Sequence, residues 1–454
     1  MRSRFRRVRS AVTALVLGAA LTVAAGGPVG AGTGADRVDN PYAGAAGVYV
    51  NPEWSARAAA EPGGEQVAGR PTFVWLDSIA SVRGTGGRLG LRGHLDQALR
   101  QASGRSGFVF QVVLHDLPGR ACAHPARQGE LGPGELDAYK ARYVDPIAAI
   151  LGHPKYAALR IVTVVEPGSV LDLAMNAVNT PGYSPLCRTI LDNGDYVNGI
   201  GYALARLGAV ANTYNYLDAG HHAALGYPYT AEPYVDLLRQ AASASGSTPG
   251  NVHGVIANTA EYFALHEPYF SVGDIVNGAP VHQSRWVDWN SYVDELPFVH
   301  DLRTRLVDAG FPVGVGALID TSRNGWGGPA RPSGPGPTTS VDAYVDGSRI
   351  DRRLHVTNWC NQSGAGLGER PATAPAPGVD AYVWAKPPGE SDGAARPASG
   401  GGDVPLDVMC DPDYSGSGGG SRPTGAMRDA PPYGGWFPAA FRQLVGNAHP
   451  PLTG

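Results

Sequence analysis

Seven short runs rich in β-branched and aromatic residues alternate along this chain with longer segments of helical periodicity. The runs cover residues 73–76, 108–114, 160–165, 213–217, 252–256, 313–319 and 381–384. The helical patterns cover residues 89–102, 135–150, 196–207, 234–242, 290–309 and 437–448, and we expect Pro297 to interrupt the fifth. Strands that alternate with helices favour parallel pairing, so the sequence predicts an α/β fold, either a barrel or an open sheet.

Polar or aromatic side chains stand at the end of most of the predicted strands. They are Trp75, Asp77, His115, Asp116, Glu166, Asp218, His221, Asp320, Arg323 and Lys386. The carboxyl ends of parallel strands converge on one face, so we expect these side chains to meet over the mouth of the barrel. Two segments rich in Gly, Pro and Ser, residues 325–340 and 393–424, are interpreted as loops over this mouth, because strand or cysteine signals resume after each.

The N-terminus has the pattern of an exported protein. Five arginines occupy the first nine residues, and an apolar stretch and a run of small residues follow. This order is typical of a secretory signal peptide and is too short for a membrane anchor. We therefore predict a signal peptide at residues 1–35, a single domain at residues 36–454, and a secreted mature protein that is not membrane-bound. Four cysteines in an oxidising compartment indicate two disulfides.

The composition excludes several classes of protein. Hydrophobic residues make up 43% of the chain and charged ones 17%, and 63 Gly and 38 Pro indicate a loop-rich fold that still buries a core. Without residues 1–35 the chain has 31 basic against 40 acidic residues and no basic run, so nucleic acid is not an expected partner. No spacing of ligands or glycines indicates a metal or a cofactor. We expect a monomer.

Aromatic and acidic residues at a barrel mouth point to a sugar site. Sugar rings stack on Trp, and paired carboxylates cleave glycosidic bonds. Trp75 beside Asp77 fits this interpretation, although Trp75 could equally be a core aromatic next to a loop.

Several long blocks of the chain closely resemble glycoside hydrolase family 6, above all its bacterial cellobiohydrolases. They include FVWLDSIA, HDLPGRACA, RIVTVVEPGSV, YLDAGHHA, LIDTSRNGWGGPARP, NWCNQSGAGLGERP and VDAYVWAKPPGESDG. The resemblance implies a distorted (β/α) barrel of about seven parallel strands with a tunnel or cleft at their C-terminal ends. It also implies inverting hydrolysis of β-1,4-glucan, with β-1,4-glucan and cello-oligosaccharides as partners, and the disulfides Cys122–Cys187 and Cys360–Cys410.

Half of the family's site is matched by this sequence. The resemblance makes Asp392 the candidate general base and Arg323 its ion-pair partner. The remaining matches are residues that contact the substrate in the family, namely Trp75, Asp218, His221, Trp359, Lys386 and Glu390.

The other half of the site departs from the family pattern. Gly168 occupies the position of the general acid, and Ala121 occupies that of the Asp that tunes the proton network. Three further changes are His115 in place of a Tyr, Arg127 in place of a roof-loop Ser, and Ala224 in place of a leaving-group Trp, with Tyr227 at the next Trp.

These departures predict glucan binding with strongly reduced or absent hydrolysis, because inverting cleavage needs an acid and a base. The alternative is an active cellobiohydrolase or endoglucanase with a substitute acid or an unusual substrate. The candidates for a substitute acid are Asp172, His115, Asp116 and His124, although Asp116 belongs to a structural turn of the family. Glu166 is interpreted as a buried structural carboxylate.

Overall fold

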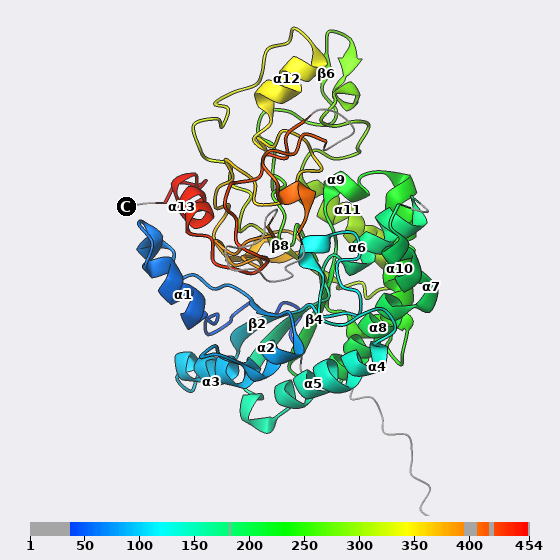
Figure 1. Cartoon of the computed structure of the whole chain (residues 1–454), viewed down its shortest axis with the longest axis vertical. Helices are drawn as coiled ribbons and strands as arrows, with labels where there is room; N and C mark the ends of the chain where they lie inside the picture. The colour runs from blue at the N-terminus through cyan, green and yellow to red at the C-terminus, as the bar shows by residue number, and fades with distance from the viewer. Residues whose placement is uncertain (1–36, 181–182, 395–405, 417–421, 453–454) are drawn as a thin grey trace, which may run out of the picture. The chain divides into compact units, whose positions relative to one another are not determined.

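One eight-stranded sheet forms the centre of the molecule (Figure 1). The computed structural model describes residues 37–180, 183–394, 406–416 and 422–452, so the predicted signal peptide lies outside the described residues. The strands are β1 (Val74–Leu76), β2 (Phe108–Leu114), β3 (Leu159–Val165), β4 (Thr213–Asp218), β5 (Gly254–Ala257), β8 (Gly316–Asp320), β10 (Val379–Val383) and β9 (Ala372–Ala376), given in their spatial order. All neighbours pair in parallel except β9, which is antiparallel to β10.

The sheet curls so that its first strand approaches its last parallel strand. The backbone N–H of Phe73 donates to the carbonyl of Trp384 at 3.2 Å, which links the segment before β1 to the end of β10. The seven parallel strands are the seven that the sequence predicts. The prediction of a distorted (β/α) barrel is therefore confirmed.

The strands are buried on both faces, as parallel strands covered by helices are. Along β2, Phe110 and Val112 pack toward the helices in the largest core cluster, whereas Val109 and Val113 belong to a separate cluster inside the barrel. Tyr42, from the segment before the first helix, also packs in the interior and donates a hydrogen bond to Gln111 at 2.8 Å. Because the interior is filled by side chains, a ligand has room only at an end of the barrel.

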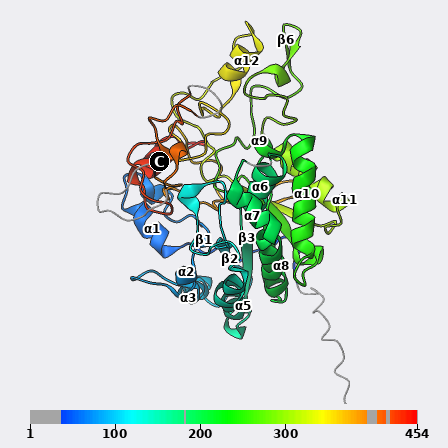
Figure 2. The same ribbon diagram turned by 45° about the vertical axis from the view of Figure 1, so that its right-hand side comes forward.

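Helices surround the sheet (Figures 1 and 2). The longer ones are α1 (Pro52–Ala59), α3 (Leu91–Ala102), α7 (Pro185–Asn193), α8 (Asp195–Gly208), α10 (Pro228–Ser243), α11 (Glu295–Asp308), α12 (Val341–Ser348) and α13 (Pro438–Gly446). The shorter ones are α2 (Ile79–Arg83), α4 (Leu136–Ala138), α5 (Asp145–Leu151), α6 (Ser169–Leu173) and α9 (His222–Leu225). Both views show α7, α8 and α10 packed side by side. Among the described residues, no helix combines the length and apolar character needed to cross a bilayer.

Three features differ from the sequence-based expectations. Pro297 does not interrupt a helix: it lies in the first turn of α11, where a backbone N–H has no intrahelical acceptor and its loss costs nothing. The segment 135–150 is not one α-helix, since a π-helical stretch, Tyr139–Val144, joins α4 to α5. The antiparallel strand β9 and a small hairpin of β6 (Ile275–Val276) and β7 (Ala279–Pro280) were not predicted.

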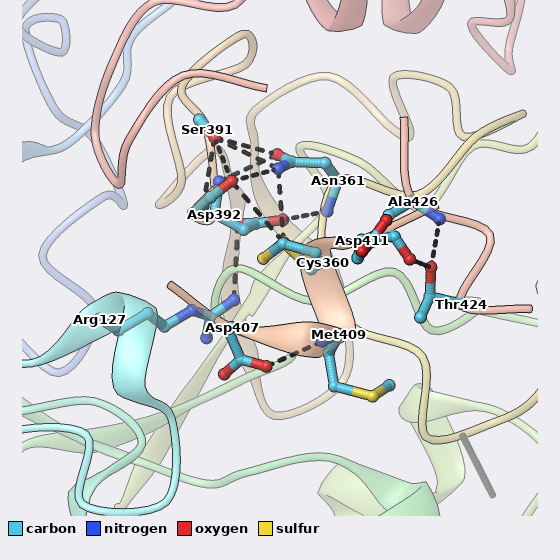
Figure 3. Close-up of a disulfide and its surroundings, with 12 residues drawn as sticks. Arg127, Cys360, Asn361, Ser391, Asp392, Asp407, Met409, Asp411, Thr424 and Ala426 are labelled. Carbon is cyan, nitrogen blue, oxygen red and sulfur yellow. Dashed lines mark hydrogen bonds and ion pairs between the residues drawn. A yellow bond between two sulfur atoms is a disulfide. The ribbon is translucent and has the colours of Figure 1, made fainter. Parts of the chain in front are cut away.

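Both implied disulfides are present. Cys122 is bonded to Cys187 and Cys360 to Cys410. The first ties the segment after β2 to α7, and the second lies beside Asp392 in a hydrogen-bonded cluster (Figure 3). The two pairings agree with the prediction.

Candidate active site

A cavity opens at the carboxyl ends of the parallel strands. It is lined by residues that belong to β1 and β4 or follow β2, β3, β4, β5 and β10, including Trp75, His115, Ala121, His124, Arg127, Gly168, Asp172, Asp218, His221, Glu261, Lys386, Asp392 and Tyr433. Residues from separate strands therefore meet at one mouth, as the strand-end pattern predicts. None of residues 325–340 lines this cavity, so the expectation that this segment covers the mouth stays a prediction.

Asp392 is completely buried on the floor of the cavity and fully hydrogen-bonded. Nη1 of Arg323 donates to both carboxylate oxygens at 2.9 and 2.8 Å. The hydroxyl of Tyr262 and the backbone N–H of Asn361 each donate to Oδ2 at 2.9 Å. Figure 3 shows the loops of Asn361 and Ser391 enclosing the carboxylate. The structure thus brings Asp392 and Arg323 together as an ion pair.

The surroundings of Asp392 hold its carboxylate ionised. Burial alone opposes ionisation, but the positive charges of Arg323, Arg127 and Lys386 outweigh it and lower the pKa of Asp392 to about 2. A carboxylate with so low a pKa is a poor proton acceptor, because a general base works best when its pKa is near the working pH. Asp392 is therefore available as an anion but is weakly basic.

Arg127 lies across the part of the site that the sequence assigns to the bound sugar. Its guanidinium carbon is 4.0 Å from the centre of the Trp359 ring, and its Nη2 is 3.5 Å from Oδ1 of Asp392. Two of its nitrogens, Nε and Nη2, are buried without a hydrogen-bond partner among the described residues. Trp359 is only 8% exposed and does not line the cavity. In this conformation Arg127 covers a face of the Trp359 ring, the ring to which the resemblance assigns sugar stacking.

Gly168 stands at the edge of the cavity where α6 begins. Its φ is +81°, and a Cβ built on it would meet no atom within 4 Å. Its backbone N–H donates to Oδ2 of Asp218 at 3.2 Å. The position therefore has room for a side chain, but most residues other than glycine would adopt its backbone conformation only with strain.

Ala121, in the segment after β2, also has a left-handed backbone conformation. It has φ +54° although it is not glycine, and it is 8% exposed beside the cavity. Asp and Asn adopt this left-handed conformation more readily than Ala does. Neither Gly168 nor Ala121 offers a titratable atom, so this side of the cavity has no carboxylate at the two positions where the resemblance expects one.

Asp218 is the carboxyl group in contact with Gly168. Burial is the main reason that its pKa is raised to about 7, although the N–H groups of Gly168 and Gly220 act against this. A carboxyl with this pKa carries a proton for much of the time near neutral pH. The sequence placed Asp218 in the cleft, but nothing in the sequence indicated that it would hold a proton.

Two of the four candidates for a substitute acid lie as a pair on the cavity wall. Nε2 of His124 is 3.3 Å from Oδ1 of Asp172, and the His124 ring meets the Trp359 ring edge-on at 5.0 Å. Asp172 belongs to the first turn of α6, four residues after Gly168. Their side chains contact each other as well as the cavity.

The other two candidates do not offer a proton to the cavity. Burial, followed by the charge of Arg120, lowers the pKa of His115 far below its usual value, so its ring is neutral. Asp116 does not line the cavity. Burial and the nearby Glu166 raise its pKa to about 9. Glu166 accepts hydrogen bonds from the backbone of Asp116 and from Tyr139, which agrees with its interpretation as a buried structural group.

Trp75 and Lys386 form the opposite wall of the cavity. The indole N–H of Trp75 donates to the Ala385 carbonyl at 2.7 Å, which fixes the ring. Nζ of Lys386 is 5.5 Å from the centre of that ring and donates to the Ser391 carbonyl at 3.3 Å. Glu390 does not line this cavity but a neighbouring hollow that also contacts Trp75. The structure thus assigns Trp75 to the cavity wall rather than to the core alone.

His221 caps α9 below the cavity. Its ring stacks on Phe263 with 4.2 Å between ring centres, and its Nδ1 accepts a hydrogen bond from the N–H of Ala224 at 3.3 Å. Burial lowers its pKa far below the usual range. Ala224 and Tyr227 do not line the cavity.

Three residues of the site were missed by the sequence analysis. The hydroxyl of Tyr262 donates a hydrogen bond to Asp392, and the centre of the Tyr433 ring lies 4.9 Å from Nζ of Lys386. Glu261 lines the cavity. Glu261 and Tyr262 follow β5 by a few residues, so the strand-end pattern could have found them. Only the tertiary structure brings Tyr433, which stands in the C-terminal region, to the same strand ends.

The chain was compared with known proteins. Residues 38–448 match the family described as Glycosyl hydrolases family 6. Exoglucanase A of Cellulomonas fimi is 39% identical over 99% of this chain and 53% of its own length, so the chain spans about half of that relative. The 1,4-beta-D-glucan cellobiohydrolase CEL6C of Podospora anserina is 32% identical over 86% of this chain and 81% of that protein.

Solved structures of related proteins superimpose on this chain. The catalytic domain of Cellulomonas fimi Cel6B superimposes with a TM-score of 0.86 at 39% identity, covering 92% of this chain and 97% of that chain. Cellobiohydrolase II (Cel6A) of Humicola insolens superimposes with a TM-score of 0.67 at 26% identity, covering 89% and 98%. The match over residues 38–448, the fold and the cavity lead to one conclusion: this chain is a member of glycosyl hydrolase family 6.

Proposed function

We propose that this protein is a secreted, cellobiohydrolase-type protein that binds β-1,4-glucan and hydrolyses it very slowly or not at all. The observation that carries this proposal is the asymmetry of the cavity. On one side, the carboxylate of Asp392 accepts a hydrogen bond from Nη1 of Arg323 at 2.8 Å. On the other side, Gly168 and Ala121 have no titratable group that could donate a proton.

The missing proton donor matters because the leaving group of a glucan is a sugar alkoxide. Inverting hydrolysis needs one carboxylic acid to protonate that oxygen and one carboxylate to activate water. General acid catalysis contributes roughly 10²–10⁴ to the rate, and a cleft without it loses that factor. The low pKa of Asp392, about 2, weakens the base as well.

Glucan binding is supported by the relatives and by the cavity wall. The Humicola insolens structure was solved in complex with glucose and cellotetraose. Trp75 and Lys386 line the cavity of this chain. Trp75 offers a ring face on which a sugar ring stacks, and Lys386 offers an ammonium group that donates hydrogen bonds to sugar hydroxyls. Arg127 covers Trp359, so sugar stacks on that second ring only after Arg127 moves.

Asp392 and Arg323 act in this proposal as the anion and the cation beside the cleaved bond. Asp218 and His221 contribute to the floor of the cleft, and Glu390 acts from the neighbouring hollow. The basic and apolar pattern of residues 1–35 supports secretion.

A second candidate function is slow hydrolysis with Asp218 as the acid. The observation that favours it is the position of this carboxyl: it contacts Gly168, lines the cavity and has a pKa of about 7. A protonated carboxyl in that place has a proton to offer, whereas Gly168 has none. Asp218→Asn would then abolish turnover of cellohexaose.

Calorimetric titration and product analysis on the same protein test the proposal. Cellobiose, cellotetraose and cellohexaose are titrated, and release of reducing ends from cellohexaose is followed beside Asp392→Ala. We expect measurable binding and a turnover within about tenfold of that variant. Absence of binding for all three sugars, or turnover at least 10³-fold above Asp392→Ala, would overturn the proposal.

A further inference from the structure

A second hollow, beside Trp286, has four arginines among its nine lining residues. Its wall includes Arg285, Trp286, Asp346, Arg349, Arg352 and Arg422. The arginines come from the segment before α11, from the end of α12 and the segment after it, and from the C-terminal region. None of these residues lines the glucan cavity. Figures 1 and 2 place α12 beside β6, at one end of the molecule in both views.

Two of the guanidinium groups are held rigidly. Arg349 is 7% exposed, its Nε donates to Oδ1 of Asp346 at 3.1 Å, and its guanidinium carbon is 3.9 Å from the Trp286 ring centre. Nη1 of Arg352 donates to the backbone carbonyls of Asp346 and Arg349, at 2.8 Å in each case. A guanidinium fixed in this way loses little conformational entropy when an anion binds.

Positive charge in the hollow exceeds negative charge. Arg285 pairs with Asp342 at 3.0 Å and Arg349 with Asp346 at 3.1 Å, but Arg352 has no carboxylate partner within the described part of the chain. Burial lowers the pKa of Arg352 and the charge of Arg349 adds to this effect, while the carboxylates of Asp346, Asp351 and Glu267 act against it. A bound anion would relieve that repulsion. The excess is unusual in a protein whose residues 36–454 are acidic overall.

The rest of the wall fits a sugar that bears the anion. Leu354 is 54% exposed beside the arginines, and Val356 also lines the hollow. Guanidinium forks match the geometry of carboxylate oxygens, and apolar side chains match the C–H faces of a pyranose ring. A bare inorganic anion would use only the first of these two surfaces.

We propose that the hollow beside Trp286 is a binding site for an acidic sugar, with Arg352 and Arg285 holding its carboxylate. The site lies apart from the glucan cavity, so it does not depend on hydrolysis or on the glucan-binding function proposed above. It would give the protein a second contact with plant or microbial polysaccharides that carry uronic acid units.

Calorimetric titration of the full chain at fixed ionic strength tests the proposal with three probes: sodium glucuronate, sodium sulfate and glucose. We expect glucuronate to bind, sulfate to bind at least tenfold more weakly, and glucose not to bind at this site. Arg352→Gln should weaken glucuronate binding by tenfold or more. Arg239→Gln, at an exposed site on α10, is the matched control and should leave binding unchanged.

One further variant and one competition experiment keep the test decisive. Arg285→Gln changes an exposed side chain, so it reports on the site even if Arg352→Gln fails to fold, and it should also weaken glucuronate binding. Saturating cellotetraose should leave glucuronate binding unchanged, which separates this site from the glucan cavity. No binding of glucuronate, equal binding of sulfate, or binding that survives both arginine substitutions would overturn the assignment.

Discussion

Arg127 couples the two elements of the site that face it, the Trp359 ring and the Asp392 carboxylate. A guanidinium over a Trp face is attracted by the ring, and a second cation near Asp392 deepens the lowering of its pKa. In the proposed function, one residue thus covers a stacking surface and weakens the base. A Ser at this position would do neither.

Replacing Arg127 by Ser should strengthen glucan binding. The Trp359 face becomes free, and a buried aromatic contact contributes about 2 kcal/mol to binding. We expect cellotetraose affinity to rise by roughly thirtyfold in a calorimetric titration. The exposed Arg188→Ser serves as the control, and an affinity that stays the same or falls in Arg127→Ser would show that Arg127 does not cover the sugar site.

Replacing Arg323 by Met should destabilise the fold strongly. Asp392 is fully buried, so removing the guanidinium whose Nη1 bonds to both of its oxygens leaves a buried charge without adequate compensation, at a cost of about 3–5 kcal/mol. Urea unfolding measures the change. The surface pair of Arg188 and Asp192 provides the comparison, because Arg188→Met should produce no resolvable change; equal effects of the two substitutions would contradict the account.

Asp218 should make stability depend on pH. Its pKa of about 7 in the folded state lies above the unfolded value near 3.9, so its proton stabilises the fold below pH 4. That contribution is lost as the pH rises through 7. The free energy of unfolding of Asp218→Asn, relative to the parent, should therefore rise between pH 4 and pH 8, by on the order of 3 kcal/mol. A difference that is constant over this range would refute the raised pKa.

At the scale of elements, the sequence was sufficient to predict the strands that are buried on both faces. All seven parallel strands were predicted because each is an apolar run covered on both faces, as in β2. The strand β9 was missed because it is a largely exposed edge, Ala372–Ala376, whose composition carries no strand signal. Pro297 was misinterpreted because composition does not reveal whether a Pro falls in the first turn or in the middle of a helix.

The candidate site was predictable only in part. Asp392, Lys386 and Trp75 were identified because they stand in long motifs, and the structure does bring them to one mouth. The cover that Arg127 forms over Trp359 was not predicted, since it depends on how the loop after β2 folds against a segment more than 200 residues away. Long-range packing of this kind leaves no local pattern in a sequence.

The loop that carries Arg127 is tied down by a disulfide. Cys122 and Cys187 are 65 residues apart, and closing a loop of that length stabilises a fold by roughly 4 kcal/mol. Replacing both by Ser should lower the midpoint of urea unfolding accordingly and loosen the cover over Trp359. Mass mapping of the unreduced parent provides the check: free thiols at these positions would remove the basis for this expectation.

At the scale of the whole molecule, the barrel is retained, while the resemblance predicts changes in one half of the site. The fold superimposes on the Cellulomonas fimi domain with a TM-score of 0.86, so the departures at Gly168 and Ala121 are local. A fold does not determine activity, which depends on particular groups at the site. Restoring those groups on an intact scaffold is therefore the direct way to examine the account.

The decisive measurement is the turnover of cellohexaose and of dinitrophenyl β-cellobioside by the parent and by Gly168→Asp/Ala121→Asp. Both positions have positive φ, which Asp tolerates better than most residues, and a Cβ at Gly168 meets no atom within 4 Å. The dinitrophenyl leaving group needs almost no protonation. We predict that the double variant gains at least tenfold on cellohexaose and little on the dinitrophenyl substrate. A parent that cleaves cellohexaose as fast as the dinitrophenyl substrate, with no gain in the variant, would contradict the account.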